Sequence, residues 1–146
     1  MRAIAGVKLL AVAGCLCLTA GVRADDGKDD TLRGKWNIVG MVYRGQVQDF
    51  GGPTGGTMTI TDGKLQLKYL SYDTPSEWAI AIQPSVIPRR IDVRLPHDDE
   101  RRLGIYELKD GVLRIIFARP GDDRPKDFDA RKDEKLILYT LKRPSK

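Results

Sequence analysis

Few residues of this sequence have the types and the spacing that catalysis requires. A nucleophilic serine or cysteine needs a base beside it, but the single histidine, His97, lies in a polar stretch at 96–100, and no serine has the setting of a nucleophile elbow. Both cysteines, Cys15 and Cys17, lie within the first 24 residues, so zinc sites built on histidine and cysteine are excluded from the rest of the chain. We therefore predict a protein that is not an enzyme and carries no cofactor.

Two acidic runs and one glycine-rich run offer weaker chemistry. The carboxylates at 98–100, and those of Asp127 and Asp129, are the oxygen ligands that calcium prefers, but neither spacing matches an EF-hand loop. The run 51–56, GGPTGG, is followed by no lysine and no helical pattern, so it does not make a phosphate-binding loop. These runs predict no metal site and no phosphate site.

Glu107 is the one acid whose environment depends on how its strand is oriented. The two faces of a strand at 102–108 carry Leu103, Ile105 and Glu107, and Gly104, Tyr106 and Leu108. If the first face points inward, a carboxylate is buried among apolar side chains and its pKa rises. If the second face points inward, Glu107 is solvated and Tyr106 lines the interior. We favour the second orientation.

The first 24 residues have the pattern of a signal peptide. Arg2 and Lys8 precede an apolar run at 9–22, and small residues around Ala24 offer a cleavage site. We expect an exported chain, periplasmic or secreted, that begins at residue 25. The alternative is a lipid on Cys15, because the residues before it resemble a lipoprotein processing box. We expect the protein to associate with a membrane only if Cys15 carries this lipid.

The remaining chain is nearly neutral and free of cysteine. Removal of three basic residues with the signal reduces the basic residues from 25 to 22 against 20 acidic ones, a net charge of +2 that implies no nucleic-acid partner. Residues 25–31 are expected to be a flexible acidic segment. Residues 32–146 are expected to form one monomeric domain, large enough to be stable through its core without disulfides.

Alternating apolar and polar residues predict strands throughout this domain. Period-two alternation is clearest at 58–60, 65–69 and 91–95, and the Asp-Gly pairs at 62–63 and 110–111 are typical of tight hairpin turns. The expected strands are 35–44, 56–61, 64–70, 77–83, 89–95, 102–108, 112–118 and 135–143. Eight short strands with local connections indicate an all-β fold, an antiparallel up-and-down barrel, with a sandwich as the alternative.

The expected interior consists of large side chains, so it is either filled by them or leaves space for one small ligand. Its members are Trp36, Ile38, Val42, Met58, Ile60, Leu65, Leu67, Tyr69, Trp78, Ile80, Ile82, Ile91, Val93, Leu95, Leu113, Ile115 and Phe117. The last strand is apolar on both faces. Its outer face is therefore expected to be covered, by the segment 119–134 or, alternatively, by a second subunit.

The long connections collect at one end of such a barrel. Those at 45–55, 71–76, 96–101 and 119–134 alternate with the short ones and so surround one mouth, where recognition commonly occurs; the glycine-rich run is then a lid. With Arg44 they hold eleven acidic and seven basic residues. The expected acidic rim includes Asp98, Asp99, Asp122 and Asp123, and the expected ligand-lining residues are Tyr69, Trp78 and Tyr106.

The two ends of the domain carry a pair of residues with a known structural role. The sequence Gly34-Lys35-Trp36 at the start, together with Arg143 at the end, resembles the lipocalin pattern. In that pattern, tryptophan closes the barrel floor beneath an arginine of the last strand. The resemblance implies that Gly34, Trp36 and Arg143 close the barrel through a cation–π contact worth roughly 0.5–2 kcal/mol.

The chain also resembles a family of small exported, uncharacterised domains found in planctomycetes. The matching residues are Leu32, Gly34, Trp36, the stretch 104–108 (GIYEL), the turn 110–111, Leu113-Arg114-Ile115, Arg124-Pro125 with Phe128, and Leu141-Lys142-Arg143. The family supplies no activity. The leading hypothesis is therefore a module that binds a small apolar ligand at the mouth. The alternative is a protein-interaction or inhibitor module of the cell envelope that acts through its acidic rim.

Overall fold

The computed structural model describes residues 28–49, 55–97 and 99–145, and these residues form strands and turns without a helix. The strands are β1 (Gly34–Tyr43), β2 (Gln46–Asp49), β3 (Gly56–Thr61), β4 (Lys64–Tyr69), β5 (Ser76–Gln83), β6 (Arg89–Arg94), β7 (Arg101–Lys109), β8 (Val112–Phe117) and β9 (Ile137–Lys142). Within these ranges no helix is long and apolar enough to cross a membrane. The predicted signal peptide and Cys15 lie outside the described residues.

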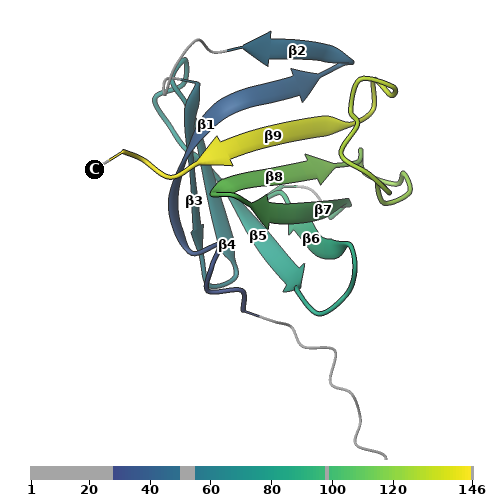
Figure 1. The fold of residues 1–146 in the computed structure, drawn as a ribbon, viewed down its shortest axis with the longest axis horizontal. Coiled ribbons are helices and arrows are strands. Elements are labelled where there is room, and N and C mark those ends of the chain that lie inside the picture. The colour runs from purple at the N-terminus through teal and green to yellow at the C-terminus, as the bar shows by residue number, and fades with distance from the viewer. Residues whose placement is uncertain (1–27, 50–54, 98, 146) are drawn as a thin grey trace, which may run out of the picture.

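The strands form a closed antiparallel barrel (Figure 1). From β3 to β9 each strand pairs with the next one, and β1 completes the circle by pairing with β3 on one side and β9 on the other. This closure confirms the predicted eight-stranded barrel and removes the sandwich alternative. β2 is an additional strand, paired with the end of β1, within the region 45–55 that was predicted to be a loop. Arg44 and Gly45, with φ of 51° and 73°, make the tight turn that returns the chain.

A bulge in β1 changes which of its side chains face the interior. The pairing with β9 slips between Ile38 and Gly40, and an extra residue in a strand reverses the alternation of its faces. Met41 therefore packs against the inner core, whereas Val42 packs in a separate outer cluster. The predicted inward position of Val42 is wrong for this reason. The buried inner core consists of Leu32, Trp36, Ile38, Met58, Ile60, Leu65, Leu67, Trp78, Ile91, Val93, Tyr106, Leu113, Ile115, Phe117, Tyr139 and Leu141.

The floor of the barrel is closed by residues from both ends of the domain. The guanidinium of Arg143 lies 3.8 Å from the centroid of the Trp36 ring and donates a 2.8 Å hydrogen bond to the carbonyl of Thr31. The indole Nε1–H of Trp36 donates to the carbonyl of Leu32 at 2.8 Å. Gly34 has a φ of 113°, and a Cβ built on it would lie 2.8 Å from Nη1 of Arg143. The predicted closure by Gly34, Trp36 and Arg143 is therefore present in the structure.

The segment between β8 and β9 covers part of the outer wall. Ala130 is buried with Ile105, Ile116 and Leu138 on the outer faces of β7, β8 and β9, and Phe128 packs against the same cluster. This explains why β9 is apolar on both faces, and it confirms the covering by the segment 119–134 that was predicted from the sequence.

An ion pair on the outer wall settles the orientation of β7. Tyr106 is buried with 1% exposure, and Glu107 points outward, where its Oε1 accepts hydrogen bonds from the guanidinium of Arg114 on β8. Both partners are partly exposed. The favoured orientation, with Glu107 solvated and Tyr106 inside, is confirmed. Because Tyr106 and Arg102 lie on the same face of β7, this orientation also points Arg102 inward.

Candidate functional site

The two ends of the barrel differ in their surfaces. The strand ends Tyr43 and Tyr69 lie at the mouth, and apolar side chains there remain exposed: Tyr43 by 41%, Leu70 by 68% and Tyr72 by 66%. The Tyr72 ring stands edge-on to the ring of Tyr69, with centroids 6.3 Å apart. An aromatic and apolar rim therefore leads into the barrel at the mouth, while the Trp36–Arg143 contact closes the floor.

Polar side chains cross the interior just below this rim. The hydroxyl of Tyr69 on β4 and that of Tyr139 on β9 share a 2.8 Å hydrogen bond, which joins two walls of the barrel. Arg102 is near the mouth end of β7, opposite the buried Val93 of β6. Its Nε is buried and has no hydrogen-bond partner among the described residues. These three side chains, Arg102, Tyr69 and Tyr139, are called the polar layer.

The electrostatics of the polar layer link Arg102 to both phenols. Burial raises the pKa of Tyr69 above its ordinary value, whereas the hydrogen bond with Tyr139 and the charge of Arg102 lower it in part. Burial, the charge of Tyr69 and the hydrogen bond with it raise the pKa of Tyr139 well above its ordinary value, and the charge of Arg102 again acts in the opposite direction. Both hydroxyls are therefore protonated at neutral pH.

Aromatic side chains pack beside the polar layer in the core of the barrel. Phe117 meets Trp78 and Tyr139 edge to face, with centroids 6.2 and 6.4 Å away. Tyr69 is thus at the mouth, as predicted. Trp78 is only 8% exposed and belongs to the packed core, so its predicted role in lining a ligand is not supported.

Tyr106 lies at the floor, far along β7 from the mouth. Its hydroxyl donates a 2.7 Å hydrogen bond to the carboxylate of Asp29, which lies 3.8 Å from the guanidinium of Arg89. The predicted role of Tyr106 at the mouth is therefore not supported, because the orientation of its strand places it against the N-terminal segment. Residues 29–31 are held to the floor by these contacts and by Arg143, in contrast to the flexible segment expected at 25–31.

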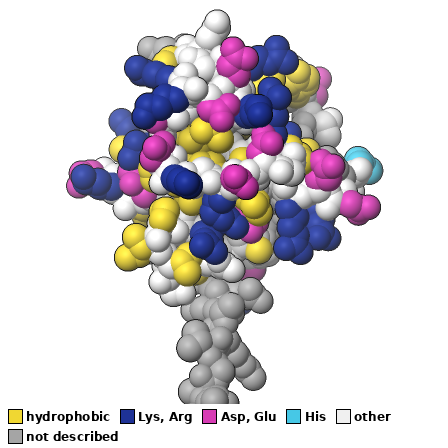
Figure 2. Space-filling view, turned by 90° about the vertical axis from the view of Figure 1, so that its right-hand side faces the viewer, with side chains coloured by type: hydrophobic (Ala, Val, Ile, Leu, Met, Phe, Trp, Pro, Cys, Tyr) yellow, Lys and Arg dark blue, Asp and Glu magenta, His cyan; other side chains and the backbone are white. Residues whose placement is uncertain are grey.

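The predicted acidic rim of four aspartates stays a prediction. Asp98 lies outside the described residues, whereas Asp99 and Asp123 are exposed and Asp122 is partly buried. Beyond Asp123, Arg124 anchors the segment 119–134 to the outer wall by hydrogen bonds to the Asp92 carboxylate and to a backbone carbonyl at 2.7 Å. The acids of this segment therefore spread along the wall, and Figure 2 shows basic and acidic side chains interleaved on this face.

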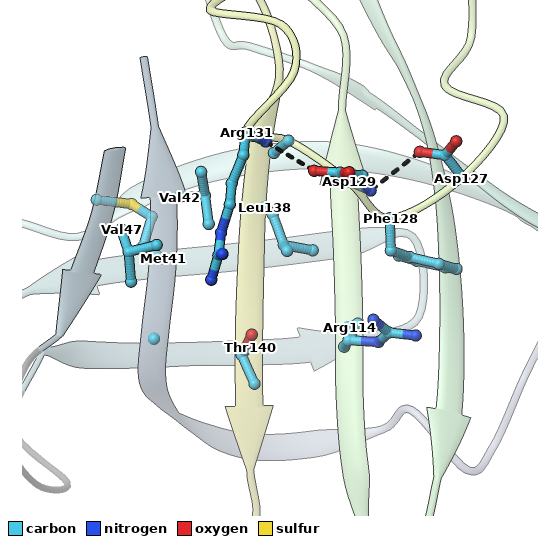
Figure 3. A pocket seen from close by; sticks show the side chains of 12 residues that line it. Met41, Val42, Val47, Arg114, Asp127, Phe128, Asp129, Arg131, Leu138 and Thr140 are labelled. Atoms are coloured by element: carbon cyan, nitrogen blue, oxygen red, sulfur yellow. Dashed lines mark hydrogen bonds between the residues drawn. The ribbon is translucent and has the colours of Figure 1, made fainter. Parts of the chain in front are cut away.

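A groove of about 710 Å³ lies on the outer wall beside this segment (Figure 3). The base of this groove includes Gly40, Leu138 and Thr140, and Val47 of β2 forms part of one side. The opposite side is the chain at 127–131. The backbone N–H of Asp129 donates to the Asp127 carboxylate there at 3.0 Å. The spacing of these two aspartates therefore belongs to a turn of the chain.

A second hollow, of about 510 Å³, lies beside the floor. Apolar side chains of β3 and β5, including Ile60 and Ile82, line it together with charged residues of the N-terminal segment. These charges are matched, because Asp62 accepts a 2.6 Å contact from Arg33 and lies 3.7 Å from Lys28. The floor thus differs from the mouth, where Arg102 forms no ion pair with the residues that the structure describes.

Sequence reasoning missed Arg102 and Tyr139. An arginine near the start of a strand is normally solvated, and Tyr139 was considered only as part of an apolar strand. The orientation of β7 contained a signal for Arg102: if Tyr106 faces inward, the residue four positions earlier does so too. No local pattern indicates the contact between Tyr69 and Tyr139, since 70 residues separate them.

Comparison with models of protein families, with curated proteins and with solved structures found no match to this chain. The resemblance to the planctomycete domain family therefore stays a prediction. The candidate site rests on the geometry of the mouth.

Proposed function

We propose that this chain is an exported, non-enzymatic module that binds a small, largely apolar molecule at the mouth of its barrel. The observation that carries the proposal is the exposed apolar rim formed by Tyr43, Leu70 and Tyr72. Burial of apolar surface is worth roughly 25 cal/mol per Å², so these side chains offer binding energy to a ligand that covers them.

The interior supports a shallow site and not a deep one. Met41, Tyr69, Leu95 and Ile137 are partly buried against the core, whereas Trp78 and Phe117 are buried in it. We therefore place the ligand against the rim. The segment at 70–75 connects β4 and β5 at this end, and it would border a bound molecule.

Binding of a neutral apolar probe tests the proposal. The purified chain is titrated with N-phenyl-1-naphthylamine, whose fluorescence increases in apolar surroundings. We expect saturable binding to the wild type and at least about fivefold weaker binding to the variants Leu70→Ser and Tyr72→Ser, because each removes apolar surface from the rim.

Ile87→Ser is the matched control, because Ile87 is 98% exposed and lies in the β5–β6 connection at the other end of the barrel. It should bind the probe as the wild type does. Absence of saturable binding to the wild type, or equal loss in the Ile87 variant, would refute binding at the mouth. Native mass spectrometry of protein isolated from its own cells should show a bound small molecule.

A further inference from the structure

The polar layer places an arginine at the mouth of the barrel: the Arg102 side chain is partly exposed, but its Nε is buried. Arg102 projects from β7, with its buried Nε unpaired among the described residues. None of the ion pairs formed within 28–49, 55–97 and 99–145 includes Arg102. By contrast, the partly buried Arg124 and the more exposed Arg114 on the outer wall both bind carboxylates.

An unpaired guanidinium donor in an apolar interior is unfavourable. A buried donor that loses its partner costs about 1–3 kcal/mol, and more when it is charged. Buried charges in proteins are accordingly paired or hydrogen-bonded. The position of Arg102 therefore indicates a partner that arrives from outside the chain and carries negative charge.

The tyrosine pair, which interacts electrostatically with Arg102, offers a further donor. In the 2.8 Å contact between Tyr69 and Tyr139, one hydroxyl donates its hydrogen to the other. Each hydroxyl has one hydrogen, so the accepting tyrosine keeps a hydrogen that is free to bind another acceptor. Arg102 and this hydroxyl together supply hydrogen-bond donors to an anion. The guanidinium is a cation and the phenol is neutral, so neither group repels a negative charge.

We propose that the polar layer binds the carboxylate of a small amphipathic ligand, with Arg102 as the ion-pair partner and the Tyr69–Tyr139 pair as an additional hydrogen-bond donor. This inference rests on the proposed binding at the mouth and specifies the ligand class. A single arginine matches a single negative charge. Because Phe117 and Trp78 are buried in the packed core, we place the carboxylate at the polar layer and the apolar part against the rim.

Three ligands of equal chain length separate charge from apolarity. Decanoate, 1-decanol and decylammonium are each used to displace N-phenyl-1-naphthylamine from the purified chain at neutral pH. Decanoate should bind at least about tenfold more tightly than decanol, and decylammonium more weakly than decanol, because only the carboxylate pairs with the guanidinium.

Two arginine variants show whether the preference comes from the polar layer. Arg102→Met keeps a long apolar side chain, and it should bind decanoate no more tightly than decanol while still binding decanol. Arg101→Met is the matched control: Arg101 is adjacent and exposed, on the opposite face of the strand, so this variant should keep the preference. Tyr139→Phe should reduce the preference by about threefold or more. Circular dichroism checks that each variant is folded.

The outcomes distinguish the two proposals. If decanoate and decanol bind the wild type equally, or if Arg102→Met keeps the preference for decanoate, binding at the mouth stands and the carboxylate inference is overturned. If neither the probe nor any of the three ligands binds the wild type, the proposed function fails, and this inference fails with it.

Discussion

Replacement of Arg143 by glutamine measures how strongly the floor holds the barrel together. The guanidinium lies 3.8 Å from the Trp36 ring centroid and donates to the carbonyls of Thr31 at 2.8 Å and Lys35 at 3.4 Å. Since Arg143 is exposed, the cation–π contact is worth about 0.5–1 kcal/mol. We take the two hydrogen bonds as about 0.5–1 kcal/mol each. The expected loss of unfolding free energy is thus about 2 kcal/mol.

Urea denaturation followed by far-ultraviolet circular dichroism provides the measurement. With a slope of about 1–3 kcal/mol per molar urea, a loss of about 2 kcal/mol lowers the midpoint by about 1 M. Arg143→Lys keeps the charge but not the planar group that contacts the ring and two carbonyls together, so it should fall between wild type and Arg143→Gln. A midpoint shift below about 0.3 M for Arg143→Gln would show that the contact does not stabilise the barrel.

Three further changes test the packing and electrostatics of the barrel by the same denaturation. Trp36→Ala should cost about 3–5 kcal/mol, as for other buried aromatic residues, and near-normal stability would mean that the ring is not buried. Gly34→Ala should cost more than about 1 kcal/mol, because of its φ of 113° and the close approach of Arg143; an unchanged midpoint would contradict this. Burial raises the pKa of Asp29, but hydrogen bonds from Thr31 and Tyr106 outweigh it and lower that pKa below 3.8. The carboxylate therefore stabilises the fold above pH 3.8 and less so as the pH falls below it, and Asp29→Asn should be destabilised at pH 6 and differ less from wild type at pH 3.

The features that the sequence predicted well depend on local patterns. Alternation at 58–60 and 91–95 and the Asp-Gly turns require only neighbouring residues, and the strands they define lie where expected. The Trp36–Arg143 contact is non-local, but both residues belong to a recognisable motif. These signals were sufficient for the barrel and its floor.

The features that were missed depend on contacts between distant strands. The bulge between Ile38 and Gly40 follows from the pairing of β1 with β9, and nothing in the apolar run around it indicates a slip, which is why Val42 was placed inside. The path of the segment 119–134 is set by the contact of Arg124 with Asp92, across 32 residues. A charge count by connection does not include such contacts, so the acidic rim stays a prediction.

Stability without ligand distinguishes a binding role for Arg102 from a structural one. If Arg102 holds the mouth together, its removal destabilises the chain. If it is kept for an external anion, the ligand-free chain carries the cost of an unpaired buried donor, and the replacement of such a group by an apolar one of similar size is neutral or stabilising. We therefore expect Arg102→Met to raise the unfolding free energy by up to about 1–3 kcal/mol, with Arg101→Met unchanged within about 0.5 kcal/mol. In the presence of excess decanoate the order should reverse, because a ligand that binds only the folded state stabilises the wild type more than the variant. A large loss of stability in ligand-free Arg102→Met would assign the residue to the architecture of the barrel.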